Sequence, residues 1–75
     1  MNTTELTEKE IIKIRNDTSF VGWTGLSFYR VLSEDFIREF QDKVEWDFIS
    51  GYQKLSIDFI REFQDKVDWN YISYS

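Results

Sequence analysis

The sequence contains no cysteine, no histidine and no proline, and glycine occurs only three times. Without cysteine or histidine the chain has no disulfide, no Ser-His or Cys-His nucleophile pair and none of the usual zinc ligand sets. It also lacks a glycine-rich loop for phosphate and the alternating oxygen ligands of an EF-hand. We therefore expect a protein that is not an enzyme and has no catalytic residue, no cofactor and no metal.

Long apolar runs and an excess of positive charge are absent as well. No run approaches the roughly 18 residues of a membrane span, and the first ten residues lack the basic and then apolar plan of a signal peptide. The 14 acidic and 9 basic side chains give a net charge of −5. Direct nucleic-acid binding needs the opposite sign. These features predict a cytoplasmic protein that binds neither a membrane nor nucleic acid directly.

What the chain does contain is a repeat. Residues 35–44 (DFIREFQDKV) return unchanged as residues 58–67, which is a shift of 23 positions. Tryptophan occurs at positions 23, 46 and 69, each time within the motif Val-x-Trp-x-x-(Ile/Leu)-Ser. A fixed period of roughly 20–50 residues is typical of stacked repeats. The sequence predicts one domain of three units, about residues 6–31, 32–54 and 55–75, the first degenerate and with about three extra residues within 16–20.

Each unit opens with a helix-start signal. In the first unit Thr7 and Glu10 have the spacing of a capping box, and Leu6 and Ile11 have that of a hydrophobic staple. Ser33 and Ser56 hold the position of Thr7 in the other two units. The sequence therefore predicts that helices begin just after Thr7, Ser33 and Ser56.

The repeated segment has helical rather than strand periodicity. Phe36, Ile37, Phe40 and Val44 fall on one helical face, and the opposite face pairs Arg38 with Asp42 and Glu39 with Lys43 at i,i+4. A solvated helix face explains Glu39 and Asp42 better than an acid–base pair does. A shorter helix is expected after each Val-x-Trp corner, with Gly51 as a C-cap in the second unit.

The fold class that follows is all-α, with three short αα-hairpin repeats stacked as a small solenoid. Fourteen aromatic side chains supply its core. The tryptophans are read as core residues that set the spacing of the units. The alternative, that they are stacking platforms for bases, needs a basic groove that the sequence does not offer.

Two surfaces are candidates for partner binding. Residues 1–31 carry four acids and four bases, whereas residues 32–54 carry six acids and three bases, so the negative charge belongs to the regular repeats. The acidic candidates are Glu34, Asp35, Glu39, Asp42, Glu45 and Asp47. The apolar candidates are Ile57, which replaces Glu34 in the third unit, together with Tyr71 and Tyr74. A lone exposed isoleucine, which is common, explains Ile57 equally well.

The segment LSEDFIREFQDKVEWDFIS of residues 32–50, followed by Gly-Tyr-Gln-Lys, resembles a short tandem repeat of poorly characterised proteins from large DNA viruses, bacteriophages and bacteria. The resemblance is strong over residues 32–75 and weak over 6–31. It carries no known catalytic residues. It implies a viral or mobile-element setting and an interaction scaffold.

Two functions remain open at this point. The first is a small acidic protein, plausibly phage-encoded, that inhibits a host nucleic-acid-handling or defence enzyme in the manner of an anti-CRISPR, with its carboxylates imitating a phosphate backbone. The alternative is a structural or adaptor repeat protein that forms a homo-oligomer through its C-terminal apolar end. Only the first predicts association that weakens as salt is added.

Overall fold

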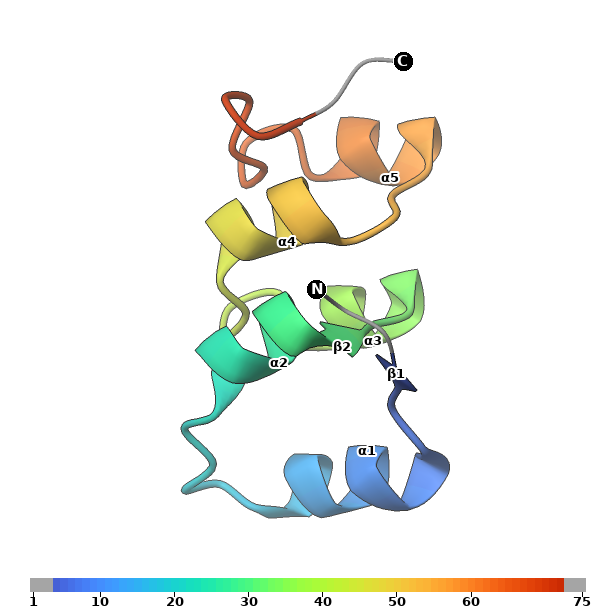
Figure 1. Ribbon diagram of the computed structural model, residues 1–75, viewed down its shortest axis with the longest axis vertical. Helices are drawn as coiled ribbons and strands as arrows, with labels where there is room; N and C mark the ends of the chain where they lie inside the picture. The colour runs from blue at the N-terminus through green and yellow to red at the C-terminus, as the bar shows by residue number, and fades with distance from the viewer. Residues whose placement is uncertain (1–3, 73–75) are drawn as a thin grey trace.

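The computed structural model describes residues 4–72, which are mainly helical (Figure 1). The helices are α1 (Glu8–Asn16), α2 (Trp23–Tyr29), α3 (Glu34–Glu39), α4 (Trp46–Tyr52) and α5 (Ile57–Glu62). Figure 1 shows α1, α3 and α5 one above another in one column, with α2 and α4 in a second column beside it. The chain alternates between the columns, and the molecule measures 34 Å along its longest axis.

The predicted helix starts are confirmed. Thr7 Oγ1 accepts a hydrogen bond from the Glu10 N–H, and the Glu10 carboxylate accepts one from the Thr7 N–H, which completes the capping box. Ser33 and Ser56 cap α3 and α5 by accepting from the backbone N–H three residues on. These caps satisfy amide groups that have no partner inside the helix.

The helix predicted through Val44 ends early, at Glu39. A continued helix would use the Arg38 carbonyl as acceptor for the Asp42 N–H, but the Gln41 side chain donates to that carbonyl at 2.9 Å. The Trp46 indole N–H then donates to the Gln41 carbonyl at 2.8 Å. Side chains therefore satisfy carbonyls at the end of the helix, and a turn carries the chain to the buried Val44.

The short helix predicted after each Val-x-Trp corner is present in the first two units, as α2 and α4, and is replaced by a turn in the third. In the second unit α4 begins at Trp46 as expected, but it runs through Gly51 and has Gln53 as its C-cap, so the prediction of a Gly51 cap is wrong. In the third unit residues 69–71 form a turn, with the Tyr71 N–H donating to the Asp68 carbonyl.

The extra residues of the first unit do not lie within 16–20. The spacing from Arg15 to Trp23 equals that from Arg38 to Trp46, whereas α1 has nine residues and α3 has six. The extension is therefore helical and precedes Arg15. The segment between α1 and α2 has its own conformation, in which the Phe20 ring packs edge-on against Trp23 at a ring-centroid distance of 5.1 Å.

A short parallel pairing of β1 (Thr4–Glu5) with β2 (Arg30–Val31) departs from the all-α prediction. Arg30 fixes this pairing, since its guanidinium donates to the carbonyls of Thr4 and Glu5 and forms an ion pair with Glu10. Two-residue strands leave no period-two pattern in a sequence.

The core lies between the two columns. Fully or nearly fully buried side chains include Ile37, Ile49 and Phe59. Trp23 packs on Phe36 and Phe40 of the second unit, and Trp46 packs on Phe59 and Phe63 of the third, at ring-centroid distances of 5.1–6.3 Å. Each of these tryptophans therefore contacts the first helix of the following unit.

Candidate interaction surfaces

Ion pairs in the described residues connect successive units. Arg15 holds Glu39 through two hydrogen bonds of 2.6 and 2.8 Å, and Arg38 holds Glu62 through two of 2.9 Å. Lys66 reaches Asp42 at 3.4 Å. Partners in all three pairs are 24 residues apart. The predicted i,i+4 pairs are wrong, because the helix ends at Glu39 and a neighbouring unit supplies the opposite charge: the preceding unit for Glu39 and the following unit for Arg38 and Asp42.

These ion pairs shift the titration of the carboxylates that form them. Hydrogen bonds from Arg15 lower the pKa of Glu39, and hydrogen bonds from Arg38 lower the pKa of Glu62. Hydrogen bonds from Arg30 and from the Thr7 backbone lower the pKa of Glu10 from 4.5 to about 2. The same contacts raise the pKa values of the three arginines. These groups are exposed or partly exposed, so solvent screening keeps their energetic effect modest.

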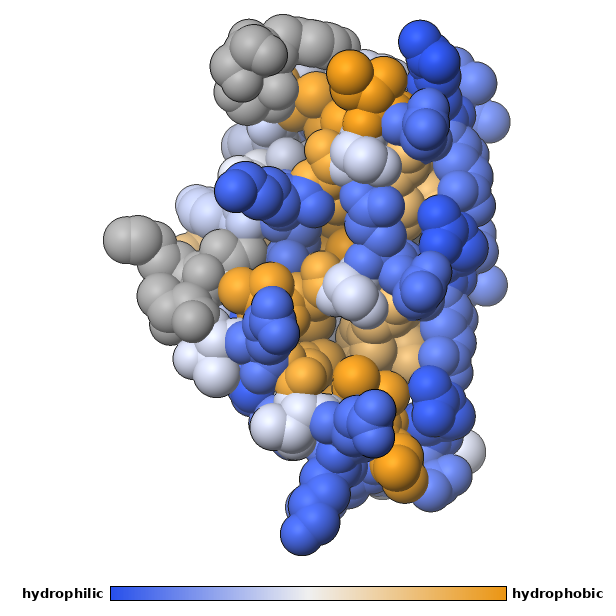
Figure 2. Space-filling view, turned by 90° about the vertical axis from the view of Figure 1, so that its right-hand side faces the viewer, coloured by the Kyte–Doolittle hydropathy of each residue, from blue (hydrophilic) through white to orange (hydrophobic). Residues whose placement is uncertain are grey.

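Three of the predicted acidic residues lie on α3, and each carboxylate already has a hydrogen-bond or ion-pair partner in this chain. Glu34 accepts from the Ser56 N–H at 2.7 Å and from the Ser56 hydroxyl at 3.2 Å. Asp35 pairs with Arg38, and Glu39 pairs with Arg15. Figure 2 shows that the face over α1, α3 and α5 carries a hydrophilic band along one edge with apolar surface beside it. Glu34 and Glu39 therefore contribute to contacts between units, whereas the pair of Asp35 with Arg38 lies within α3.

The other three predicted acids are exposed: Asp42 and Glu45 lie in the corner between α3 and α4, and Asp47 lies in the first turn of α4. Glu45 and Asp47 form no ion pair with any residue from 4 to 72. Lys66 of the next corner contacts Asp42, which places the two corners side by side. We give the name acidic corner to the acids of the two corners together, which are Asp42, Glu45, Asp47, Asp65 and Asp68.

The predicted apolar residues are not brought into one patch. Ile57 opens α5 and is 70% exposed, whereas Tyr71 is 56% exposed and lies on the other column, where a Cβ at Gly51 would come within 3.6 Å of it. Tyr74 lies outside the described residues. The structure therefore separates Ile57 from Tyr71.

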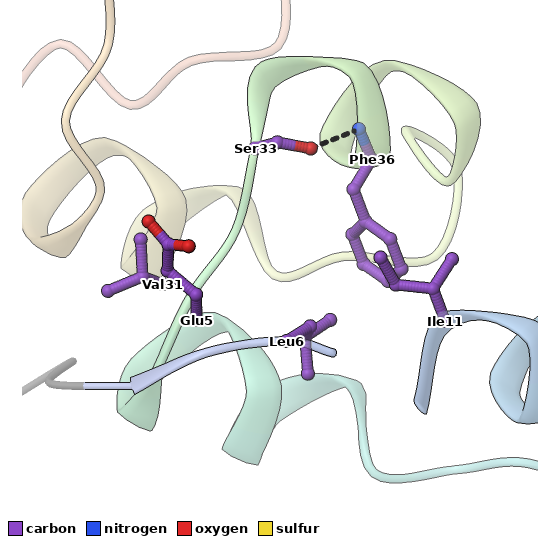
Figure 3. A pocket seen from close by; sticks show the side chains of 6 residues that line it. All are labelled: Glu5, Leu6, Ile11, Val31, Ser33 and Phe36. Atoms are coloured by element: carbon purple, nitrogen blue, oxygen red, sulfur yellow. Dashed lines mark hydrogen bonds between the residues drawn. The ribbon is translucent and has the colours of Figure 1, made fainter. Parts of the chain in front are cut away.

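The described residues offer little to a small ligand. A cleft of about 170 Å³ opens between β1, α1 and α3, where the Phe36 ring lies beside Ile11 (Figure 3). A more open hollow of about 330 Å³ lies beside Val31 and residues 51–54, at the lower end of the roughly 300–1,000 Å³ that is usual for ligand pockets. Within residues 4–72 no three His, Cys, Asp or Glu side chains are grouped to hold a metal ion. No helix in this range has the length and apolar character that crossing a membrane requires.

Three polar residues that connect the units were not predicted from the sequence. Ser27 Oγ donates to the Trp23 carbonyl and accepts from the Glu45 N–H, and Ser50 Oγ repeats both contacts with Trp46 and Asp68. Gln53 is buried, accepts from the Leu32 N–H and donates to two carbonyls. The serines recur in the Val-x-Trp-x-x-(Ile/Leu)-Ser motif, which is the signal that could have identified them.

Comparisons with family models, with curated proteins and with solved structures find no match to this chain.

Proposed function

We propose that the three units form a stacked αα-hairpin scaffold and that the protein is a small, non-enzymatic, protein-binding module. The recurrence of the same contacts supports the stack: the tryptophan-to-phenylalanine packing, the serine bonds and the arginine-to-glutamate pairs each appear twice at the repeat spacing. Such a scaffold has an elongated surface on which equivalent positions of successive units line up.

The partner we propose is a basic surface on a nucleic-acid-handling enzyme, and the binding site is the acidic corner. The observation that carries this proposal is the distribution of ion pairs. The carboxylates of α3 are occupied by this chain's own groups, whereas Glu45 and Asp47 are exposed and unmatched by a cation within residues 4–72. Carboxylates in this arrangement attract a basic nucleic-acid channel by complementary charge.

In the setting that the sequence resemblance implies, the partner is a host enzyme and the outcome of binding is inhibition. A defence nuclease of the CRISPR type is one such enzyme. The protein would occupy the channel that otherwise holds the phosphate backbone, and it would do so without contacting nucleic acid itself.

Displacement of labelled duplex DNA from a panel of nucleic-acid-binding enzymes, CRISPR nucleases included, tests the proposal. The chain should displace DNA from at least one enzyme, and less effectively as salt is raised. Removing the corner charges by Glu45→Gln and Asp47→Asn should weaken displacement more than the matched control, Glu5→Gln with Glu8→Gln. Equal effects of the two double variants, or no displacement, would reject the acidic corner.

The second candidate is an adaptor that forms a homo-oligomer through its C-terminal end, and the 70% exposure of Ile57 favours it. A mass that rises with concentration in light scattering, and that Ile57→Glu reduces to the monomer value, is the expected result. A constant monomer mass over the whole concentration range would remove this candidate.

A further inference from the structure

The interface between the second and third units includes four kinds of contact besides the hydrogen bond from the Asp68 N–H to Ser50. Trp46 packs on Phe59 and Phe63, and Arg38 holds Glu62. Asp42 meets Lys66, and Glu34 accepts from Ser56. On the second unit the residues that make these contacts are Glu34, Arg38, Asp42 and Trp46. The matching residues all come from one segment of the third unit.

The third unit carries the equivalent four positions at its outer end. A shift of 23 residues turns the set into Ile57, Arg61, Asp65 and Trp69, which we name the C-terminal face. Arg61 and Asp65 are exposed and form no ion pair within residues 4–72. Trp69 retains 48% exposure although its indole N–H donates to the Gln64 carbonyl, as the Trp46 indole does to Gln41.

We propose that the C-terminal face is a docking surface for a helix-start segment on another polypeptide, with the pattern Phe-x-x-Glu-Phe-x-x-Lys. The two phenylalanines would cover Trp69, the glutamate would pair with Arg61, and the lysine would pair with Asp65. This pattern is read from Phe59, Glu62, Phe63 and Lys66, which satisfy the same three residue types one unit earlier. The C-terminal face shares only Asp65 with the acidic corner.

Ile57 sets the strength of this docking. Its counterpart Glu34 accepts a hydrogen bond from a backbone N–H of the following unit, and isoleucine cannot do this. The face therefore keeps three of the four contacts and binds its segment less tightly than one unit binds the next. A second copy of this chain is not the expected occupant, because its own copies of the pattern are already engaged inside it.

A synthetic peptide with the sequence of residues 54–68 is a suitable probe because it has the pattern and no tryptophan. We would titrate it into the full ¹⁵N-labelled chain at up to millimolar concentration and follow the three indole N–H resonances. A short peptide orders only on binding, so weak affinity is expected. The Trp69 resonance should shift saturably, while those of Trp23 and Trp46 stay in place.

Charge exchange supplies the matched control. Arg61→Glu in the chain should weaken peptide binding by about two- to fivefold, as expected for an exposed ion pair, and a peptide carrying Glu62→Arg should restore it. Ile57→Glu should tighten binding by about two- to tenfold by restoring the fourth contact. The same change is expected to abolish self-association, so the two ideas predict opposite results.

Two results would overturn the proposal. One is the absence of a saturable Trp69 shift. The other is a shift of the Trp46 resonance, which would mean that the peptide replaces the chain's own third unit. If the peptide fails but a concentration-dependent mass remains sensitive to Ile57→Glu, the adaptor function stands and the segment proposed for this face is wrong.

Discussion

Ser27 and Ser50 connect successive units through single hydroxyl groups. Each hydroxyl lies inside the protein, donates to the tryptophan carbonyl of its own unit and accepts from the backbone N–H that precedes the next tryptophan. An amide without a partner in the interior is costly. Serine is the residue type that can both donate and accept while remaining small enough for this site.

We expect Ser27→Ala to lower the free energy of unfolding by about 1–3 kcal/mol, because the Glu45 N–H would lose its acceptor, the hydroxyl of the fully buried Ser27. Urea denaturation followed by circular dichroism measures the change. Ser19→Ala is the control, since Ser19 is exposed and bonds only the neighbouring Asp17. A loss no larger than that of the control would contradict the role assigned to Ser27.

At the scale of elements, helix starts were predictable from the sequence and helix ends were not. The caps Thr7, Ser33 and Ser56 act over three residues, so their signal is local. The end of α3 depends on Gln41 turning back to the Arg38 carbonyl and on the indole of Trp46 covering the next one. Those contacts form only when the segment between α3 and α4 has folded, and the helical periodicity of the sequence does not predict how that segment folds.

Prediction of the candidate surfaces was similarly limited. The charge count correctly located the acids in the regular repeats, but helical spacing paired Arg38 with Asp42, where the structure pairs it with Glu62. Contacts between residues that are 24 positions apart decide which carboxylates form ion pairs. The β1–β2 pairing has the same cause, since Arg30 joins segments that are distant in the sequence.

The ion pair between Glu10 and Arg30 ties α1 to β2 and predicts acid sensitivity. The pKa of Glu10 falls from 4.5 to about 2 in the folded protein, so its contribution to stability is complete above about pH 4.5 and is lost as the pH falls to about 2. We expect Glu10→Gln to flatten the stability profile in this window. Thermal unfolding at a series of pH values measures it.

Glu8→Gln is the matched control for this experiment. It removes the same charge from the first turn of α1 but leaves the contacts of Glu10 with Thr7 and Arg30 in place. The control should therefore keep the acid dependence of the parent chain. Parallel profiles for the two variants would show that the Glu10 contact does not govern acid stability.

At the scale of the whole molecule, the contribution of each tryptophan to stability depends on whether another unit follows it in the chain. Trp46 has the two phenylalanines of the third unit beneath it, and Trp69 is 48% exposed despite an equivalent sequence context. A chain of 75 residues buries little surface when it folds, so the aromatic surface that Trp46 buries is a large part of the total.

We expect Trp46→Ala to lower the free energy of unfolding by about 3–5 kcal/mol, which is close to the total stability of a small domain. Trp69→Ala should cost clearly less, because its side chain is more exposed than that of Trp46. Urea midpoints from far-ultraviolet circular dichroism provide the comparison without relying on indole emission. Equal losses from the two variants would mean that the units are not held by the packing described.

The additional turn of α1 has a consequence for length variation among chains of this design. An α-helix repeats every 3.6 residues, so three extra residues bring the following side chains to within about 60° of the same orientation. Arg15 still meets Glu39 although α1 is three residues longer than α3. Insertions of one or two residues would rotate that arginine away, so viable indels in the first helix should come in steps of a complete turn.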